Sequence, residues 1–308
     1  MNIILSKNIK LTTLFQSFAI FLLSLFPVTS TAQNNIIFPK AQSANDASHN
    51  YYIRLINIAL QKVNKSDKYT VTLSDTILSQ GRTLKELSKK DGLVNIYQTG
   101  TTQQREADLI SIKIPLLKGT LGYRINLIHK DNIKLFDNIT TMNELSKLRA
   151  CQGRHWPDSD ILENSGLKVT RNSNYQNMFL QIKNKHCDYF PRAITEAYVE
   201  AEALNDPDIV VYDKLVISYL FPMYFFVSPH HKQMADDIET GLEIAIKDGS
   251  FDALFNNSQI TQSLFPLSKW KKSRILKIKN HLLPISTPTS NKTLWIELPT
   301  KENISVAK

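Results

Sequence analysis

Strand-like and helix-like patterns of apolar residues alternate along the chain from about Ile36 onward. Apolar side chains in residues 52–63 recur every three or four positions, which predicts a helix with one buried face. Residues 69–73 alternate between apolar and polar side chains, which predicts a strand. A short helix at residues 84–87 and a strand at residues 93–97 follow. This βαβαβ order predicts a parallel sheet with helices on both of its faces.

A second α/β series occupies the middle of the chain. Its strands are predicted at residues 123–128, 148–151, 167–170, 187–190 and 209–212. Thr141 and Glu144 have the spacing of a capping box, which opens one helix. Ser159 and Asn174 can cap two more helices, and residues 195–204 also follow a helical pattern. The middle of the chain is therefore a second βαβ set.

After the second α/β series, the chain is predicted to return to the first. Residues 215–227 are rich in β-branched and aromatic side chains, which predicts a long extended segment. A strong helix follows, with one apolar face formed by Met234, Ile238, Leu242 and Ile246. We therefore expect an α/β fold of two lobes between which the chain crosses twice. Ligands of open α/β sheets bind beyond the carboxyl ends of strands, so the segments after Tyr97, Cys151 and Phe190 are the candidates for function.

The N-terminus has the features of a secretory signal. Two lysines precede an apolar run over residues 11–28, and the small residues Ser30 and Ala32 form a signal-peptidase site. The uninterrupted apolar core at residues 19–26 is short for a membrane span, although an uncleaved anchor is the alternative. No cysteine directly follows the leader, which disfavours a lipid anchor. No later apolar segment is long enough to cross a bilayer. We predict a signal peptide over residues 1–32 and a protein of the periplasm that is not embedded in the membrane.

Composition narrows the class of protein. The chain has 308 residues, 42% of them hydrophobic and 21% charged, which suits a folded protein of two domains. The net charge of +9 makes nucleic acid a candidate partner. Much of this excess lies in the leader and in residues 269–279, where Trp270 is the only interleaved aromatic residue. A solvated charged face is the better interpretation, and we expect no nucleic-acid partner.

The two cysteines leave their pairing open. Cys151 and Cys187 can form a disulfide in an oxidising compartment, but two cysteines do not make a disulfide framework. Each lies in a short apolar run, so buried free thiols are an equal alternative.

The segment after the third predicted strand carries groups that can hold an anion. Gly100 offers backbone donors, Thr101 and Thr102 offer hydroxyls, and Arg105 offers a guanidinium. Arginine can donate two parallel hydrogen bonds to a carboxylate, so this combination suits a carboxylate or another planar anion. The alternative is a loop, a helix cap and a solvated arginine.

This segment also resembles part of a known family. A strand, then Thr101-Thr102-x-x-Arg105, then an apolar stretch reaching a crossover is similar to the bacterial extracellular solute-binding proteins of the amino-acid type, the second structural class of periplasmic binding proteins. Further matching features are the export signal, the helix at residues 51–64, the crossover at 118–122, the strand ending at Gly153, Lys185-His186-Cys187-Asp188, the return at 222–227 and residues 247–251. Together they span nearly the whole chain after the leader.

The resemblance implies a two-lobed fold that closes around a small ligand. Lobe 1 would comprise residues 33–120 plus 220–308, and lobe 2 residues 121–219, joined by two hinge crossings. It further implies that Arg105 clamps an acidic group of the ligand, assisted by Gly100 and Thr102. The loop formed by Gly153, Arg154, His155 and Trp156 would supply contacts from lobe 2. Trp156 can act as an aromatic lid or as a packing anchor.

The sequence departs from the family at one position. An acidic residue that holds a ligand ammonium group is often found just after the strand at Asp188, but here the chain has Pro191-Arg192-Ala193, with Glu196 as a substitute one turn later. Arg105, Arg154 and Arg192 would then converge on one cleft, where their mutual repulsion requires a negative charge. This favours an anionic ligand. The alternative is that Arg192 pairs with Glu196 or Asp188.

No catalytic motif is present. The sequence lacks a Gly-x-Ser-x-Gly elbow, a phosphate-binding loop, a dinucleotide fingerprint and a His-Glu-x-x-His motif, so we expect no enzyme, cofactor or metal. We predict a monomeric solute-binding protein for an anionic or amino-acid-like ligand, presented to an inner-membrane permease or to a sensor. The alternatives are an enzyme on the same scaffold, such as a dehydratase or lytic glycosidase relative using Glu196, and a ligand-free adaptor that binds another protein.

Overall fold

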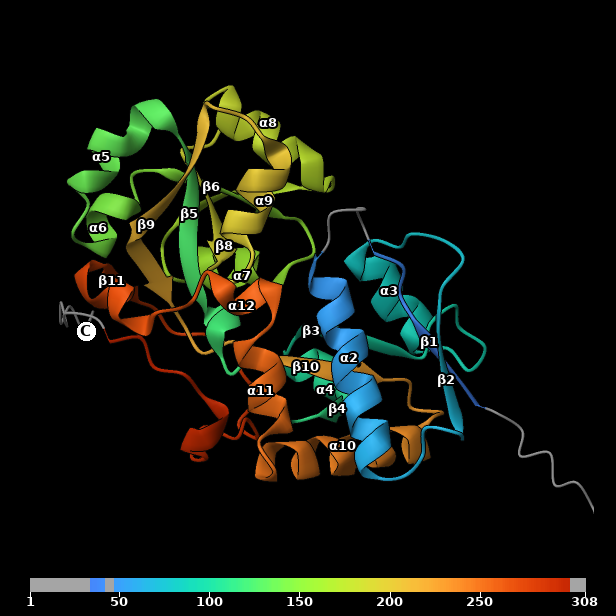
Figure 1. Ribbon diagram of the computed structural model, residues 1–308. Coiled ribbons are helices and arrows are strands. Elements are labelled where there is room, and N and C mark those ends of the chain that lie inside the picture. The colour runs from blue at the N-terminus through green and yellow to red at the C-terminus, as the bar shows by residue number, and fades with distance from the viewer. Residues whose placement is uncertain (1–33, 42–46, 300–308) are drawn as a thin grey trace, which may run out of the picture.

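The chain forms two α/β lobes that lie side by side (Figure 1). The computed structural model describes residues 34–41 and 47–299, and the predicted signal peptide lies outside them. The first lobe contains both a two-stranded and a three-stranded sheet, and the second lobe contains one sheet of six strands.

The sheets of the first lobe are only partly parallel. Their strands are β1 (Asn34–Phe38), β2 (Tyr69–Leu73), β3 (Ile96–Gly100), β4 (Ile110–Ile112) and β10 (Met223–Val227). β1 and β2 pair in parallel as predicted. β3 and β4 instead pair antiparallel with β10, which lies between them. The all-parallel sheet predicted for this lobe is therefore wrong, because a strand from late in the chain returns and separates two early ones.

Two long helices cover the first lobe. Its helices are α2 (Ala47–Lys62), α3 (Gln80–Leu87), α4 (Gln103–Asp108), α10 (Lys232–Lys247), α11 (Ser250–Asn256) and α12 (Gln259–Gln262). α2 and α10 bury their apolar faces, with Leu55 and Leu242 both fully buried. Gly241 allows these helices to approach closely, since a Cβ there would lie 2.0 Å from the carbonyl oxygen of Ala59.

The second lobe is built on a mixed sheet in the order β11-β9-β5-β8-β6-β7. Its strands are β5 (Tyr123–His129), β6 (Arg149–Gly153), β7 (Lys168–Asn172), β8 (Tyr189–Ala193), β9 (Ile209–Ser218) and β11 (Arg274–Lys277). β6 pairs in parallel with β7 and β8, whereas β5 pairs antiparallel with β8 and β9. β11 pairs with β9, so residues 274–277 depart from the predicted division, which gave residues 220–308 to the first lobe.

Local capping signals explain several helices of the second lobe. They are α5 (Ile133–Asp137), α6 (Met142–Leu145), α7 (Pro157–Asn164), α8 (Tyr175–Lys183) and α9 (Ala197–Leu204). The predicted capping box of Thr141 and Glu144 is confirmed at α6, and Asn174 caps α8. α7 begins before the predicted cap, since Pro157 occupies its first turn, a position that suits proline. Short 3₁₀ helices complete the described chain, at Thr120–Gly122, Lys130–Asn132, Leu267–Lys272 and Lys292–Leu294.

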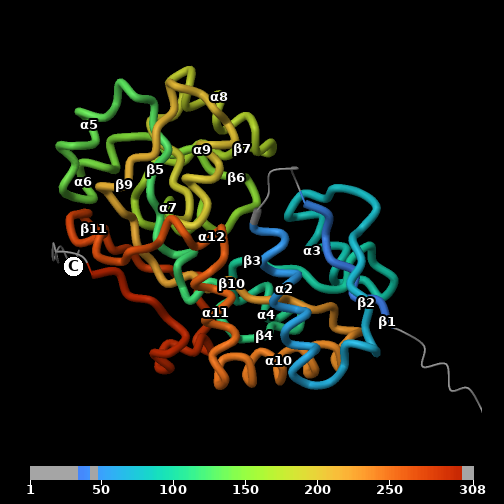
Figure 2. Tube along the Cα trace, viewed as in Figure 1, coloured from blue at the N-terminus to red at the C-terminus, as the bar shows by residue number. Residues whose placement is uncertain are grey.

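The two crossing segments contact each other between the lobes (Figure 2). The amide of Tyr219, on the returning segment, donates to the carbonyl of Gly122 at 3.0 Å. A Cβ at Gly122 would lie 1.9 Å from the carbonyl oxygen of Tyr219, so glycine is required for this contact. The amide of Leu116 likewise donates to the carbonyl of Met223 at 2.9 Å. Backbone hydrogen bonds therefore join the two crossing segments.

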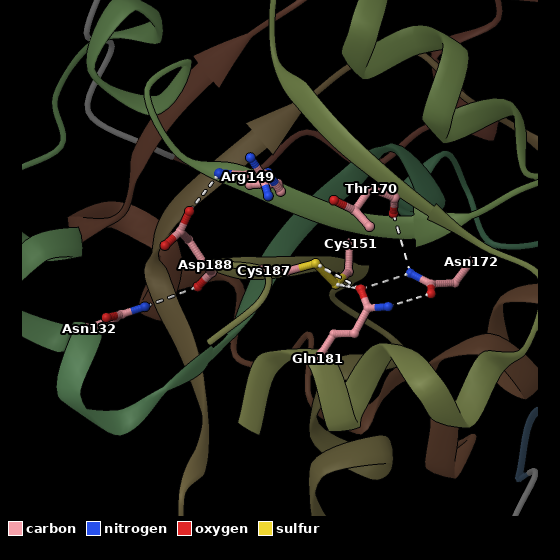
Figure 3. Close-up of a disulfide and its surroundings, with 8 residues drawn as sticks. All are labelled: Asn132, Arg149, Cys151, Thr170, Asn172, Gln181, Cys187 and Asp188. Atoms are coloured by element: carbon pink, nitrogen blue, oxygen red, sulfur yellow. Dashed lines mark hydrogen bonds between the residues drawn. A yellow bond between two sulfur atoms is a disulfide. The ribbon is translucent and has the colours of Figure 1, made fainter. Parts of the chain in front are cut away.

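Cys151 and Cys187 form a disulfide, which resolves the alternatives left by the sequence (Figure 3). The bond joins β6 to the residues just before β8, and both cysteines are fully buried. Gln181 of α8 lies beside it, with Oε1 3.3 Å from the sulfur of Cys151. Nε2 of Gln181 donates to Asn172 at 2.7 Å, which connects α8 to β7. The disulfide thus holds β6 and the start of β8 together, before the residues at which the two strands end.

Candidate ligand-binding cleft

A cleft lies at the carboxyl ends of β3, β6 and β8. It consists of a larger pocket of about 390 Å³ and a smaller pocket of about 150 Å³. The two pockets share the lining residues Ser48, Tyr97, Gln98, Trp156, Arg192 and Glu196. These residues come from both lobes, so the two pockets form one cleft between the lobes, hereafter called the cleft.

Arg105 lines the smaller pocket and has only neutral hydrogen-bond partners. Nη1 donates to Oγ1 of Thr99 at 2.9 Å and to the carbonyl of Gly100 at 2.5 Å, and Nη2 donates to Oε1 of Gln80 at 2.8 Å. Arg105 is 8% exposed and forms no ion pair with any carboxylate among the described residues. Burial lowers the pKa of Arg105 to about 10. A buried guanidinium without a counter-charge is a strong attractor for an anion.

Gly100 and Thr102 have local roles beside Arg105. A Cβ at Gly100 would lie 2.1 Å from the ring of Phe221, so glycine allows this ring to pack over the end of β3. The hydroxyl of Thr102 caps α4 by accepting from the amide of Arg105 at 3.1 Å. Gly100 lines the smaller pocket, whereas Thr102 lines a separate pocket, which Arg105, His155 and Asp160 also line. Thr102 therefore positions Arg105 through the helix that carries it.

Arg192 lies in the cleft wall and is neutralised by two carboxylates. Its Nε and Nη2 donate to the two oxygens of Glu200 at 2.7 and 2.5 Å, and Nη2 lies 2.9 Å from Oε2 of Glu196. Burial disfavours its charge, but Glu196 and Glu200 more than compensate and hold the pKa of Arg192 above its ordinary value. The alternative in which Arg192 pairs with Glu196 is thus present, with Glu200 as an additional partner that the sequence analysis missed. Arg192, Glu196 and Glu200 follow one another at intervals of four residues in the sequence, and this spacing could have indicated that they pair.

Arg154 does not line either pocket of the cleft. It is exposed, and its Nε donates to the hydroxyl of Ser173 at 3.0 Å. Of the three arginines predicted to converge, Arg105 and Arg192 line the smaller pocket and Arg154 does not. Its amide donates to the carbonyl of Asn172 and extends the strand pairing. Its side chain lines a further pocket of about 290 Å³, which shares Trp156 and Tyr175 with the larger pocket of the cleft.

Arg124 is a cleft residue that sequence reasoning missed. It lies in β5 directly after the first crossing, and its side chain is 3% exposed. Nη2 lies 2.6 Å from Oδ1 of Asp158 and Nη1 lies 3.6 Å from Oε2 of Glu196. Nε donates to the hydroxyl of Tyr219 at 2.9 Å, and this hydroxyl donates to Asp158. The sequence carries no clear signal for this network, because Arg124 and Asn126 alternate with apolar residues in β5 as solvent-facing side chains would.

Aromatic rings form one wall of the cleft. Trp156 lines both pockets and stacks on Phe190, with ring centroids 6.2 Å apart. The guanidinium of Arg192 lies 4.8 Å from the Trp156 ring centroid, a distance that permits a cation–π interaction. A Cβ at Gly153 would lie 2.4 Å from this indole, so Gly153 makes room for the ring. Trp156 is therefore both a packing anchor and part of the cleft wall.

Among the described residues, no group of three or more histidine, cysteine or acidic side chains is arranged to hold a metal ion. None of the helices in the described part of the chain combines the length and apolar character needed to span a bilayer.

Comparisons with known proteins identify the fold. No protein-family model and no curated protein matches the sequence. An ancestral arginine-binding protein bound to arginine matches with a TM-score of 0.56 and 14% identity, over 73% of this chain and 98% of that one. A probable amino-acid ABC transporter extracellular-binding protein from Bacillus subtilis matches with a TM-score of 0.54 and 15% identity, over 73% and 97%. A histidine kinase sensor domain similar to periplasmic binding proteins matches with a TM-score of 0.54 and 11% identity, over 74% and 96%.

These structures share one architecture. This chain has the two-lobed periplasmic-binding-protein fold, which confirms the predicted fold class.

Proposed function

We propose that this protein binds a small solute carrying a carboxylate and closes its two lobes around it, with Arg105 as the carboxylate clamp. The observation that carries the proposal is the buried guanidinium of Arg105, which lines the cleft and has no carboxylate partner among the described residues. A carboxylate can accept two parallel hydrogen bonds from such a group. The arginine-bound neighbour supports this choice, because its ligand is an amino acid.

The size and place of the cleft support a ligand-binding role. Small-molecule sites are commonly clefts of several hundred cubic ångströms between domains, and the larger pocket alone measures about 390 Å³. A ligand that contacts both lobes favours the closed arrangement over the open one. The open volume disfavours the adaptor alternative, in which side chains would fill the cleft.

Two features that suit an exported protein also support a ligand-binding role. The disulfide between Cys151 and Cys187 suits an oxidising compartment, as does the signal peptide predicted from the sequence. The closed form is the species that a membrane partner would recognise. One structural neighbour is an ABC transporter binding protein and another is a kinase sensor domain, so a permease and a sensor are the two partner classes to test.

The enzyme alternative depended on Glu196 as a proton donor or acceptor. Oε2 of Glu196 lies 2.9 Å from Arg192 and 3.6 Å from Arg124, and it accepts from the amide of Ala193 at 3.2 Å. A carboxylate engaged by two guanidiniums is poorly suited to exchange protons with a substrate. Binding is therefore the function that we favour.

A pair of arginine substitutions tests the proposal. Purified protein is screened by thermal shift against small carboxylates and their uncharged analogues, and binders are measured by calorimetry. We expect Arg105→Gln to weaken carboxylate binding about a hundredfold, because the ligand charge loses its partner. Arg54→Gln removes an exposed guanidinium of α2 that lines neither pocket of the cleft, so it is the matched control, with unchanged affinity. Full affinity in Arg105→Gln would overturn the assignment.

A further inference from the structure

The segment after β11, hereafter called the C-terminal strap (residues 278–299), lies against both lobes (Figure 1). It leaves the second lobe at Ile278, whose amide donates to the carbonyl of Ser218 at 2.9 Å. It reaches the first lobe at Ser286, whose hydroxyl donates to Oε2 of Glu106 at 2.9 Å. Glu106 belongs to α4, the short helix of the proposed carboxylate clamp. The strap therefore runs from the sheet of the second lobe to this helix.

The end of the strap returns to the first crossing segment and to the second lobe. The amide of Ile296 donates to the carbonyl of Lys118 at 2.9 Å, and the carbonyl of Ile296 accepts from the hydroxyl of Tyr123 at 3.2 Å. The ring of Trp295 packs over Gly119, where a Cβ would lie 2.4 Å from the indole. Both ends of the strap are therefore anchored, which limits how far its middle can move.

Asn280 connects the strap to the second crossing segment. Its side chain is buried, and both groups of its amide are used. Nδ2 donates to the carbonyl of Leu220 at 2.9 Å, and Oδ1 accepts from the amide of Leu282 at 2.9 Å. Leu220 lies between β9 of the second lobe and β10 of the first, so it belongs to the second crossing. A buried amide with both groups paired holds its neighbours in one geometry.

The same turn of the strap holds the start of α4. The amide of Gln103, the first residue of this helix, donates to the carbonyl of Leu282 at 3.1 Å. Amides of a first helical turn have no partner inside the helix, so an outside acceptor fixes the end of the helix. α4 has six residues, and a helix this short depends on such external contacts. Arg105 lies two residues further along, so the strap also sets the position of its guanidinium.

We infer that Asn280 is a positioning residue for ligand binding: through Leu282 and Gln103 it fixes the helix of Arg105 to the second crossing segment. This inference rests on the proposed function, because the helix matters for binding only if Arg105 holds the carboxylate of the ligand. Asn280 lines neither pocket of the cleft, so its effect on a ligand passes through Arg105. A clamp that is held in place before the ligand arrives lowers the cost of ordering on binding.

Hydrogen exchange of the purified protein without ligand tests the link directly. Asn280→Ala removes both hydrogen bonds of the side chain, and we expect the amides of α4 to exchange about tenfold faster than in the wild type. Asn291→Ala is the matched control, because Asn291 is an exposed asparagine of the strap that accepts from Thr293 inside the strap itself. It should leave the exchange of α4 unchanged. Unchanged exchange of α4 in Asn280→Ala, or one equal factor across the whole protein, would overturn the inference.

Gln103→Pro cuts the same link from the side of the helix. Proline lacks the amide that donates to Leu282, and the first helical position tolerates proline well. The preceding residue, Thr102, is already extended, as a residue before proline must be. We expect the remaining amides of α4 to exchange about tenfold faster here too. This variant decides the inference if Asn280→Ala does not fold, and exchange at the wild-type rate would overturn the link.

Binding measurements connect the link to the ligand. The standard amino acids, succinate and glutarate are the probes, and calorimetry measures each one that gives a thermal shift. We expect Asn280→Ala to weaken binding about tenfold in the otherwise wild-type protein, and not at all when it is combined with Arg105→Gln, because it acts through that arginine. An equal loss in both backgrounds would overturn the inference, since a general effect on the fold does not require Arg105.

The outcomes separate this inference from the proposed function. Weaker binding in Arg105→Gln together with full affinity in Asn280→Ala would overturn the inference and leave the carboxylate clamp intact. Full affinity in Arg105→Gln would overturn the clamp, whether or not exchange shows that Asn280 holds α4. If none of the probes binds, the proposed function is overturned for them, and the exchange measurements alone decide whether Asn280 holds the helix.

Discussion

Arg192 and Glu200 form a two-pronged ion pair in the wall of the cleft, with Nε and Nη2 donating to the two carboxylate oxygens at 2.7 and 2.5 Å. The sequence led us to expect that Arg192 would add positive charge to the cleft. Because of this ion pair, Arg192 does not add to the positive charge of the cleft. Arg105 is the cleft arginine that has no carboxylate partner among the described residues.

The disulfide should contribute measurably to stability. It joins Cys151 and Cys187, which are 36 residues apart. Restricting an unfolded loop of this length stabilises the folded state by about 3–4 kcal/mol. We expect the Cys151→Ser, Cys187→Ser double variant to lose that amount in urea unfolding. Reductant should lower the midpoint of the wild type and leave the variant unaffected, and equal midpoints without reductant would contradict the prediction.

Tyr219 should stabilise the second lobe through its hydroxyl. This hydroxyl accepts from Arg124 at 2.9 Å and donates to Asp158. Tyr219→Phe leaves buried charged groups with one partner fewer, which should cost about 1–3 kcal/mol of unfolding free energy. Tyr189→Phe is the control, because the buried hydroxyl of Tyr189 has no hydrogen-bond partner in the described structure. Its loss should be neutral or slightly stabilising, and equal costs for the two variants would argue against the network.

The elements of the fold were largely predictable because their signals are local. The apolar face of α10 follows the helical period, and the caps at Thr141 and Asn174 depend on residues within one turn. The partners of β10 and β11 were not predictable. A strand pattern indicates which face is buried but does not specify the neighbour, so the pairing of β10 with β3, and of β11 with β9, is invisible to local analysis.

Residues of the cleft were predictable from the sequence where they closely follow the end of a predicted strand and their side chains face the space between the lobes. Arg105 and Trp156 were found in this way, and the structure places both in the smaller pocket. Arg154 was expected there because it follows Gly153, but its side chain contacts Ser173 and lines a neighbouring pocket instead. Arg124 was missed because one polar residue in an alternating strand resembles a solvent-facing position. Its partner Asp158 lies 34 residues further on.

Gly153 should be required for the position of Trp156. An alanine Cβ there would lie 2.4 Å from the indole and would force Trp156 off Phe190. We expect Gly153→Ala to lose about 1–3 kcal/mol and to bind ligand more weakly. Gly81→Ala is the matched control, since its Cβ meets His155 at an ordinary 3.7 Å and alanine favours helix α3. If both variants match the wild type in stability and binding, the packing argument fails.

The pH dependence of ligand binding should reflect Arg105 on the alkaline side. Burial lowers the pKa of Arg105 from 12.5 to about 10, so the empty protein loses this proton at a lower pH than an exposed arginine would. A bound carboxylate favours the protonated form, so binding requires that proton. Affinity should therefore be constant at intermediate pH and should fall as the pH rises through about 10. On the acid side it should fall below about pH 4, where the ligand carboxyl becomes protonated.

Arg105→Lys distinguishes this origin from general alkaline unfolding. Lysine has an ordinary pKa of about 10.4, and the same burial would lower it further, so the alkaline loss of binding should move to a lower pH. The acid side should not move, because it belongs to the ligand. Calorimetric titrations across the pH range measure both limits, and circular dichroism at each pH confirms that the protein is folded. An alkaline limit shared by the wild type and Arg105→Lys would assign the loss of affinity to a group other than Arg105.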